Sequence, residues 1–191
     1  FSPGVVRKYW LLHGLMRALA LKRIEGFAFA AGDLHRQQVA WSGGGTVWVN
    51  RGRTDWSAGG HTLPEYGFYA RAGAVEAAIE RLAGGVVEWA RTPELYYVNA
   101  RGASVTLGPV STDGAFRLSV EGGALQLTPL PASPAFSVRL RWNELPWKLA
   151  RAAGAEALDE NGAVLRRFPL KDEAGAVALE TRAGEFAYRL R

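Results

Sequence analysis

The sequence predicts a mainly β protein, with one or more antiparallel β-sandwiches preceded by a single amphipathic N-terminal helix. Two observations predict this class. Before Ile24, apolar side chains recur at alternating steps of four and three residues, which is the period of one helix face. After Gly26, short apolar or alternating runs end at glycine, proline, asparagine or aspartate, as strands and tight turns do. The change of period between these two residues therefore separates one helix from a long series of strands.

The helix is expected to begin at Ser2-Pro3, because serine caps free amide groups and proline fits the first turn. We expect it to end near Lys22 or Arg23, where positive charge suits the C-terminal end of the helix dipole. One apolar stripe is predicted to be its buried face, formed by Val5, Tyr9, Leu12, Met16 and Leu19. This stripe must pack on a sheet or on another helix.

The strand series opens with a strong hairpin signal, in which residues 37–41 and 46–50 flank the turn 42–45. The strands that follow are expected around Trp56 and at 61–63, 68–70, 75–82, 86–91, 95–100, 104–107, 115–120 and 125–130. Such short strands, spaced by roughly 8–12 residues and separated by turn signals, favour an antiparallel sandwich over βαβ units.

A stretch with three prolines, residues 129–134, is the best candidate for a domain boundary. Beyond it we expect strands at 136–142, 155–158, 163–168, 177–181 and 186–190. The predicted organisation is a helical segment 1–25, a β-sandwich 26–131, and a second β-rich, Ig-like unit 132–191 packed on the first. The last unit would be marginal alone, so it is expected to pack against the preceding strands or share a sheet with them.

Composition excludes several classes of function. The 191 residues carry a net charge of +5, but the positive residues are scattered, so we expect no nucleic-acid partner. No uncharged apolar run is long enough to span a membrane, so no membrane partner is expected. The absence of cysteine excludes disulfides, thiolate chemistry and cysteine metal sites.

The first segment lacks signal-peptide features, and extracellular and cytoplasmic locations both stay open. Because the sequence starts at Phe1, we expect a processed or excised piece.

The sequence shows no recognisable catalytic or metal-binding motif. Three isolated histidines, His13, His35 and His61, lack ligand spacing and are interpreted as ordinary surface or loop residues. The glycine pairs lie between strands and lack the order of a phosphate-binding loop. Four acidic residues lie in turns without supporting neighbours: Asp113, Glu144, Asp159 and Glu160. We therefore assign no catalytic residue, no metal ligand and no cofactor.

Tryptophan is unusually frequent, with seven residues at positions 10, 41, 48, 56, 89, 142 and 147. Periodicity places three of them in the core: Trp10, Trp41 and Trp142. A second set, Trp48, Trp56 and Trp89, forms the candidate carbohydrate-binding platform, because an aromatic face packs on the C–H face of a sugar ring. The competing interpretation is that these residues also belong to a sandwich core, which uses large aromatic side chains as well.

Three segments together resemble a known architecture. They are the helix 5–12, the segment 46–52 followed by Asp55-Trp56, and the turn and strand 63–70. In this order they resemble the end of the catalytic barrel and the first β-sandwich of large bacterial glycoside hydrolases, of the endo-α-N-acetylgalactosaminidase-like kind and its uncharacterised relatives. The resemblance covers about residues 1–72. It implies that segment 1–25 ends an upstream barrel, which carries the catalytic carboxylates, so no catalytic residue is transferred to this chain.

Two functions from different classes follow. The first is a non-catalytic C-terminal region that supports an upstream catalytic barrel of the same polypeptide, with the helix stripe as its docking edge. The alternative is a carbohydrate-binding module that uses Trp48, Trp56 and Trp89. A third interpretation, an enzyme with an unfamiliar site, has the least support from the residues.

Overall fold

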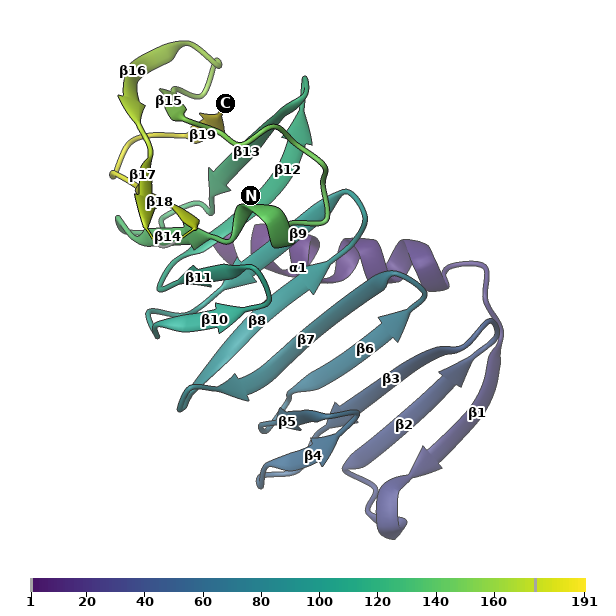
Figure 1. Ribbon diagram of the computed structural model, residues 1–191. Coiled ribbons are helices and arrows are strands. Elements are labelled where there is room, and N and C mark those ends of the chain that lie inside the picture. The colour runs from purple at the N-terminus through teal and green to yellow at the C-terminus, as the bar shows by residue number, and fades with distance from the viewer. Residues whose placement is uncertain (1, 174) are drawn as a thin grey trace. The chain divides into compact units, whose positions relative to one another are not determined.

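The computed structural model describes residues 2–173 and 175–191, which are mainly β with antiparallel sheets and one N-terminal helix (Figure 1). The predicted fold class is therefore confirmed. The chain divides into two compact units, one ending at Pro93 and the other beginning at Glu94.

The first unit contains one helix, a six-stranded antiparallel sheet in the order β1-β2-β3-β6-β7-β8, and a separate hairpin formed by β4 and β5. Helix α1 crosses one face of the sheet, where it contacts β6, β7 and β8 (Figure 1). The elements are α1 Pro3–Leu19, β1 Ile24–Phe29, a 3₁₀ turn Ala30–Gly32, β2 Arg36–Trp41, β3 Gly45–Asn50, β4 Trp56–Ala58, β5 His61–Leu63, β6 Phe68–Ala72, β7 Val75–Leu82 and β8 Gly85–Arg91.

The buried face of α1 differs from the predicted stripe. Leu11, Leu15 and Leu19 are buried, and the last two form a core with Ala70 of β6. Of the predicted stripe only Leu19 is buried and Leu12 is half-buried, whereas Val5, Tyr9 and Met16 are exposed. The period correctly indicates a helix, but two apolar rows share that period. The leucine row is the one that packs on the sheet, where Leu15 and Leu19 contact the small side chain of Ala70.

Helix α1 begins at the predicted Ser2-Pro3, but its cap and its C-terminal end differ from expectation. Ser2 is the N-cap residue and proline occupies the first turn, but the serine side chain makes no capping hydrogen bond. Instead, its carbonyl oxygen accepts hydrogen bonds from the amides of Val5 and Val6. The helix ends at Leu19 rather than at 22–23, and the amide of Lys22 donates to the carbonyl of Leu19 to close the chain into a turn.

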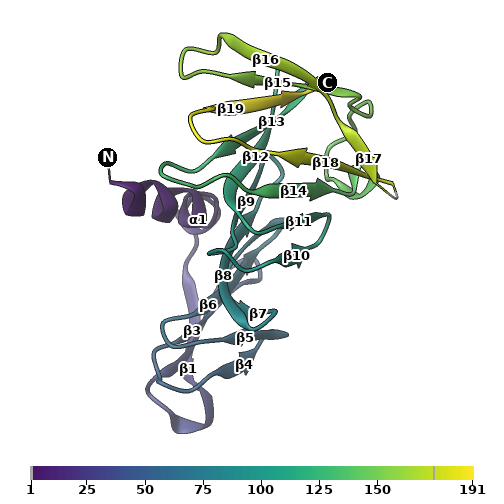
Figure 2. The ribbon, with the colours of Figure 1, turned by 90° about the vertical axis from the view of Figure 1, so that its left-hand side faces the viewer.

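The second unit is a β-sandwich of two antiparallel sheets (Figure 2). Phe116 of one sheet stacks on Phe136, beside the other sheet, with ring centres 5.5 Å apart and planes inclined by 8°. The first sheet has the order β9 Leu95–Asn99, β12 Ala115–Glu121, β13 Ala124–Pro129, β19 Ala187–Leu190, β15 Gly154–Leu158 and β16 Val164–Pro169. The second has the order β10 Val105–Leu107, β11 Val110–Thr112, β14 Ser137–Leu140, β18 Ala176–Glu180 and β17 Lys171–Glu173.

The division between the compact units does not coincide with the proline-rich stretch predicted as the boundary. Strand β13 pairs with β19, and β11 pairs with β14, so the residues after 131 complete both sheets of the second unit. Residues 26–131 are correspondingly shared between the two units, and in the first unit a helix covers the sheet face where a second sheet was expected. The prolines mark a loop, because local composition cannot show which distant strand returns to pair.

Candidate functional site

The predicted tryptophan platform lies in the first unit, but its members do not form one exposed plane. Trp89 of β8 is only 7 % exposed, and its Nε1 donates to Glu80 Oε1 at 2.6 Å. Trp48 of β3 is half-buried and stacks on Tyr69, with ring centres 5.5 Å apart. Trp56 of β4 is also half-buried and pairs across the hairpin with Leu63. Trp48 and Trp89 therefore both lie near the Tyr69 ring. Trp89 is too buried to offer a free face to a sugar ring.

The face of the sheet opposite α1 carries a polar and aromatic network under the β4–β5 hairpin. Ala70 packs on the helix, so its neighbour Tyr69 points to the other face. There His61 of β5 stacks on Tyr69 at 3.8 Å between ring centres, and its Nδ1 lies 2.8 Å from Glu80 Oε2. The Tyr69 hydroxyl donates to Glu76 Oε1 at 3.0 Å. Burial, together with this hydrogen bond, raises the pKa of Tyr69 to about 12.

This network fixes the hairpin on the sheet. The tip residue Gly59 has a positive φ of 59°, and a Cβ at this position would lie 2.8 Å from the Tyr69 ring. Only glycine allows that turn to approach the ring so closely. Both oxygens of Glu80 are hydrogen-bonded, one to Trp89 and one to His61. The carboxylate therefore serves to join the hairpin to the sheet.

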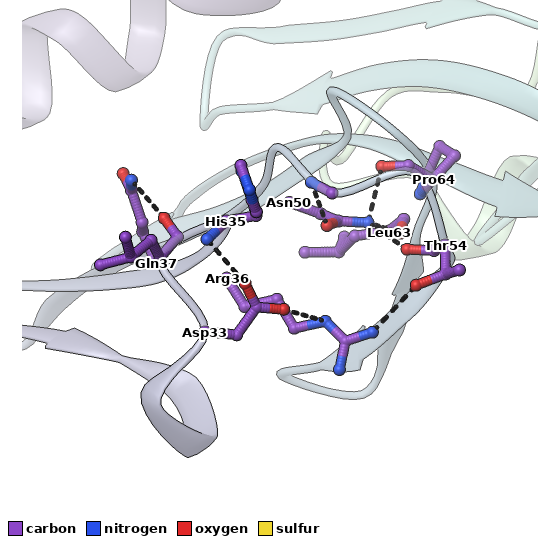
Figure 3. Close-up of polar contacts among 10 residues, drawn as sticks. Asp33, His35, Arg36, Gln37, Asn50, Thr54, Leu63 and Pro64 are labelled. Carbon is purple, nitrogen blue, oxygen red and sulfur yellow. Dashed lines mark hydrogen bonds and ion pairs between the residues drawn. The ribbon is translucent and has the colours of Figure 1, made fainter.

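A second polar centre organises the loop after β3 (Figure 3). Asn50 is fully buried, and its Nδ2 donates to the carbonyl oxygens of Thr54, Leu63 and Pro64 at 2.8–3.1 Å. Its Oδ1 accepts from the amide of Gly52 at 3.0 Å. These contacts bring the loop 51–55 and the end of β5 to one side chain, so Asn50 has a structural role.

Three neighbouring contacts hold the 3₁₀ turn and β2 near the same loop (Figure 3). Asp33 accepts a hydrogen bond from the amide of His35 at 2.9 Å, and its other oxygen lies 3.5 Å from Arg36 Nε. The Arg36 guanidinium also donates to the Thr54 hydroxyl at 3.1 Å. His35 itself is exposed in this turn, as the sequence predicts for a loop histidine.

Exposed apolar side chains concentrate on the N-terminal elements. Among the described residues with large hydrophobic side chains, eight of the twelve exposed ones lie between positions 5 and 34: Val5, Tyr9, Met16, Leu21, Ile24, Phe27, Phe29 and Leu34. Tyr9, Met16 and Phe27 are 50 %, 65 % and 55 % exposed. Such a concentration is unusual, because exposed hydrophobic residues are normally scattered singly.

Strand β1 contributes a second part of this apolar surface. Phe27 and Phe29 are two residues apart, so they share a face, and their rings meet edge-on at 4.9 Å. Phe27 pairs with Val39, which shares a face with Trp41, and Trp41 packs on the core beneath α1. The two phenylalanines therefore lie on the helix side of the sheet. We call Val5, Tyr9, Met16, Phe27 and Phe29 the α1–β1 surface.

The acidic residues of the predicted turns have local structural roles. Asp113 accepts a hydrogen bond from the amide of Ser137, and Glu144 pairs with Arg141. Asp159 accepts from two amides of its own turn. Glu160 is exposed beside it. Within residues 2–173 and 175–191, no group of three or more potential metal ligands occurs, and no helix is long and apolar enough to cross a membrane.

One charged cluster has no signal in the sequence. Glu156 of β15 lies beneath three arginines, Arg167, Arg189 and Arg191, which come from β16, from β19 and from the position after it. Strand pairing brings these arginines to the glutamate although they lie 11 to 35 positions away from it in the sequence. In the sequence the same arginines read as scattered surface charges.

Comparison with known proteins gives no further guidance, because no family model, no curated protein and no solved structure matches this chain.

Proposed function

We propose that this chain is a non-catalytic β-rich region that docks on a second domain of the same polypeptide and stabilises it. The α1–β1 surface carries the proposal, because it exposes aliphatic and aromatic side chains on two successive elements. Covering each such side chain contributes roughly 1–2 kcal/mol, so a partner surface would stabilise the pair substantially. The resemblance in residues 1–72 favours the catalytic barrel of a glycoside hydrolase as that domain.

The chemistry of the surface favours a folded domain over a polar ligand. Val5, Met16 and Phe27 offer no hydrogen-bonding group, whereas a sugar site needs polar groups placed beside an aromatic ring. Strand β1 adds an edge whose only charged side chain is Glu25, and edge strands in isolation are usually protected by charges or proline. On this proposal the chain supplies the docking surface and the docked domain supplies the catalysis.

The test begins with the coding region that precedes Phe1. The two-domain protein and the isolated chain are compared by hydrogen–deuterium exchange, with slower exchange expected at residues 5–29 in the longer protein. The double variant Tyr9→Ser/Phe27→Ser should lower the melting temperature of the docked domain, whereas the exposed control Leu165→Ser in β16 should not. A coding region without a preceding domain, or unchanged exchange at 5–29, would overturn the proposal.

A glycan panel separates this proposal from the carbohydrate-binding alternative. In affinity electrophoresis and tryptophan emission, we expect no glycan to change the mobility or spectrum of the isolated chain. A shift that disappears in Trp56→Ala would support the binding-module function instead. Hydrolysis of an aryl glycoside by the isolated chain, abolished by substituting one of its own carboxylates, would contradict the non-catalytic part.

A further inference from the structure

The side chain of Glu156 is held by more positive charge than it can neutralise. Arg167 Nε donates to Glu156 Oε1 at 2.8 Å, Arg189 Nη1 lies 3.5 Å from Oε2, and Arg191 also hydrogen-bonds Oε1. The three guanidinium groups cover the carboxylate, which is only 4 % exposed. One negative charge against three positive charges leaves the cluster with a local excess of two.

The arginines keep unused donors that face solvent. A guanidinium carries five N–H groups, and each of these three uses only a small part of them on Glu156. The side chains of Arg167 and Arg191 are 73 % and 57 % exposed. No other carboxylate within the described residues pairs with these three arginines. Their remaining donors are thus available in a fixed arrangement, because Glu156 orients all three groups.

Two open hollows border the cluster. One, of about 530 Å³, is lined by Glu156, Arg167 and Arg191 together with residues 153–155 and 168–169. The other, of about 430 Å³, is lined by Arg189 and Arg191 with Glu121, Gln126 and the β12–β13 turn. Arg191 borders both hollows. Arg167 and Arg191 both line the first hollow.

From this geometry we infer that the Glu156 cluster is a binding site for a tetrahedral oxyanion, of the sulfate or phosphate type. Arg167 and Arg191 are its principal donors, and Arg189 adds positive charge from the neighbouring strand. Planar guanidinium groups match two oxygens of such an anion, and charge-assisted hydrogen bonds are among the strongest that proteins form. The hydrogen bonds from Arg167 and Arg191 keep the carboxylate ionised, with its pKa below the ordinary value, so the arginines stay oriented at neutral pH.

The glutamate has a defined part in the site. It positions the arginines, but its negative charge also opposes an anion. Glu156→Gln keeps the size of the side chain and removes that charge, so it should tighten anion binding. This direction distinguishes an anion site from a purely structural ion cluster.

Isothermal titration calorimetry on the full chain tests the inference. Inorganic sulfate and inorganic phosphate are titrated in turn, with chloride at equal ionic strength as the reference. We expect saturable binding that weakens about tenfold in Arg167→Gln and in Arg191→Gln. The matched control Arg139→Gln removes an exposed arginine that pairs with Glu173 on the other sheet, and it should bind as the parent does. Far-UV circular dichroism without anion verifies that every variant is folded.

Comparing phosphate, sulfate and a carboxylate shows which kind of anion the site binds. Phosphate should bind more tightly as its second ionisation proceeds around neutral pH, whereas sulfate, which is already fully ionised, should not change. Equal affinity for glucuronate would show a carboxylate site and overturn the tetrahedral class. Equal responses of the parent, Arg167→Gln and Arg139→Gln would show non-specific salt effects and overturn the site itself, as would weaker binding by Glu156→Gln.

Discussion

His61 Nδ1 lies 2.8 Å from Glu80 Oε2, and this contact joins the β4–β5 hairpin to the sheet of the first unit. The other oxygen of Glu80 accepts the indole N–H of Trp89, so one carboxylate connects the hairpin, β7 and β8. Because Glu80 and Trp89 are both buried, neither polar group has water as a substitute partner.

Glu80→Ala should destabilise the protein by roughly 2–4 kcal/mol, since it leaves the buried Trp89 N–H without an acceptor and removes the contact with His61. Glu80→Gln should cost less, because its amide oxygen still accepts the hydrogen bond from Trp89. Urea unfolding followed by tryptophan emission measures both. Trypsin should cleave Glu80→Ala faster at Arg51 and Arg53, which lie before the hairpin. Exposed Glu65→Ala is the control, and an equal loss in the control would contradict this role of Glu80.

Replacing Asn50 by either aspartate or alanine should destabilise the protein. Asn50→Asp keeps the shape but replaces an N–H₂ donor by an oxygen that faces the carbonyls of Thr54, Leu63 and Pro64. Asn50→Ala leaves those carbonyls without their donor. We expect each variant to lose roughly 2–4 kcal/mol in urea unfolding. The half-buried Gln37→Ala, which loses one exposed hydrogen bond, should stay within about 1 kcal/mol, and a comparable loss there would refute the special role of Asn50.

Gly67 and Gly4 form a matched pair of glycines with opposite expectations. A Cβ at Gly67 would lie 2.5 Å from Pro64 Cδ and 2.8 Å from the carbonyl oxygen of Ile79, and the backbone cannot easily move away. A Cβ at Gly4, in the first turn of α1, meets nothing within 4 Å. Gly67→Ala should therefore destabilise the chain by about 1–3 kcal/mol, whereas Gly4→Ala should stabilise it by up to about 1 kcal/mol. Thermal unfolding of the two variants compares them, and a neutral Gly67→Ala would contradict the close packing.

The pH dependence of stability should include a contribution from Glu185. The Arg166 guanidinium, at 2.5 Å, holds the pKa of this carboxyl below its ordinary value near 4.5, against the opposing effect of burial. A depressed pKa means that the unfolded chain binds the proton first as the solution is acidified. The stabilisation is therefore complete above about pH 4.5 and is lost as the pH falls through the folded-state pKa.

Glu185→Gln measures this contribution. The variant should be less stable than the parent near neutral pH, and the difference should shrink as the pH is lowered below about 4.5. Urea unfolding at a series of pH values gives both curves, with the exposed turn residue Glu160→Gln as the control. A difference that stays constant across the acid range would show that the pair with Arg166 does not depend on the charge of Glu185.

Several features of the fold follow from local sequence alone. The helix, the hairpin at 42–45 and most strands are set by apolar period and by turn residues, because these act through neighbours a few positions apart. The same reasoning correctly placed Trp142 in the core and His35 in a loop. Trp10 and Trp41, which it also assigned to the core, are only half-buried, and His61, interpreted as a surface or loop residue, is half-buried in β5. The role of Trp56 and Trp48 in binding sugars stays a prediction, and the glycoside hydrolase resemblance stays a proposal.

Long-range pairing decided the rest. Which row of α1 is buried, whether the proline-rich stretch separates domains, and which charges meet at Glu156 all depend on contacts between residues distant in the chain. Local patterns carry no information about those partners, since a strand with a given period can pair with any neighbour of matching register. The sequence by itself determined the class of structure and the absence of familiar catalytic motifs. Only the tertiary structure decided which apolar side chains stay exposed on α1 and β1, because burial is a property of what the chain folds against.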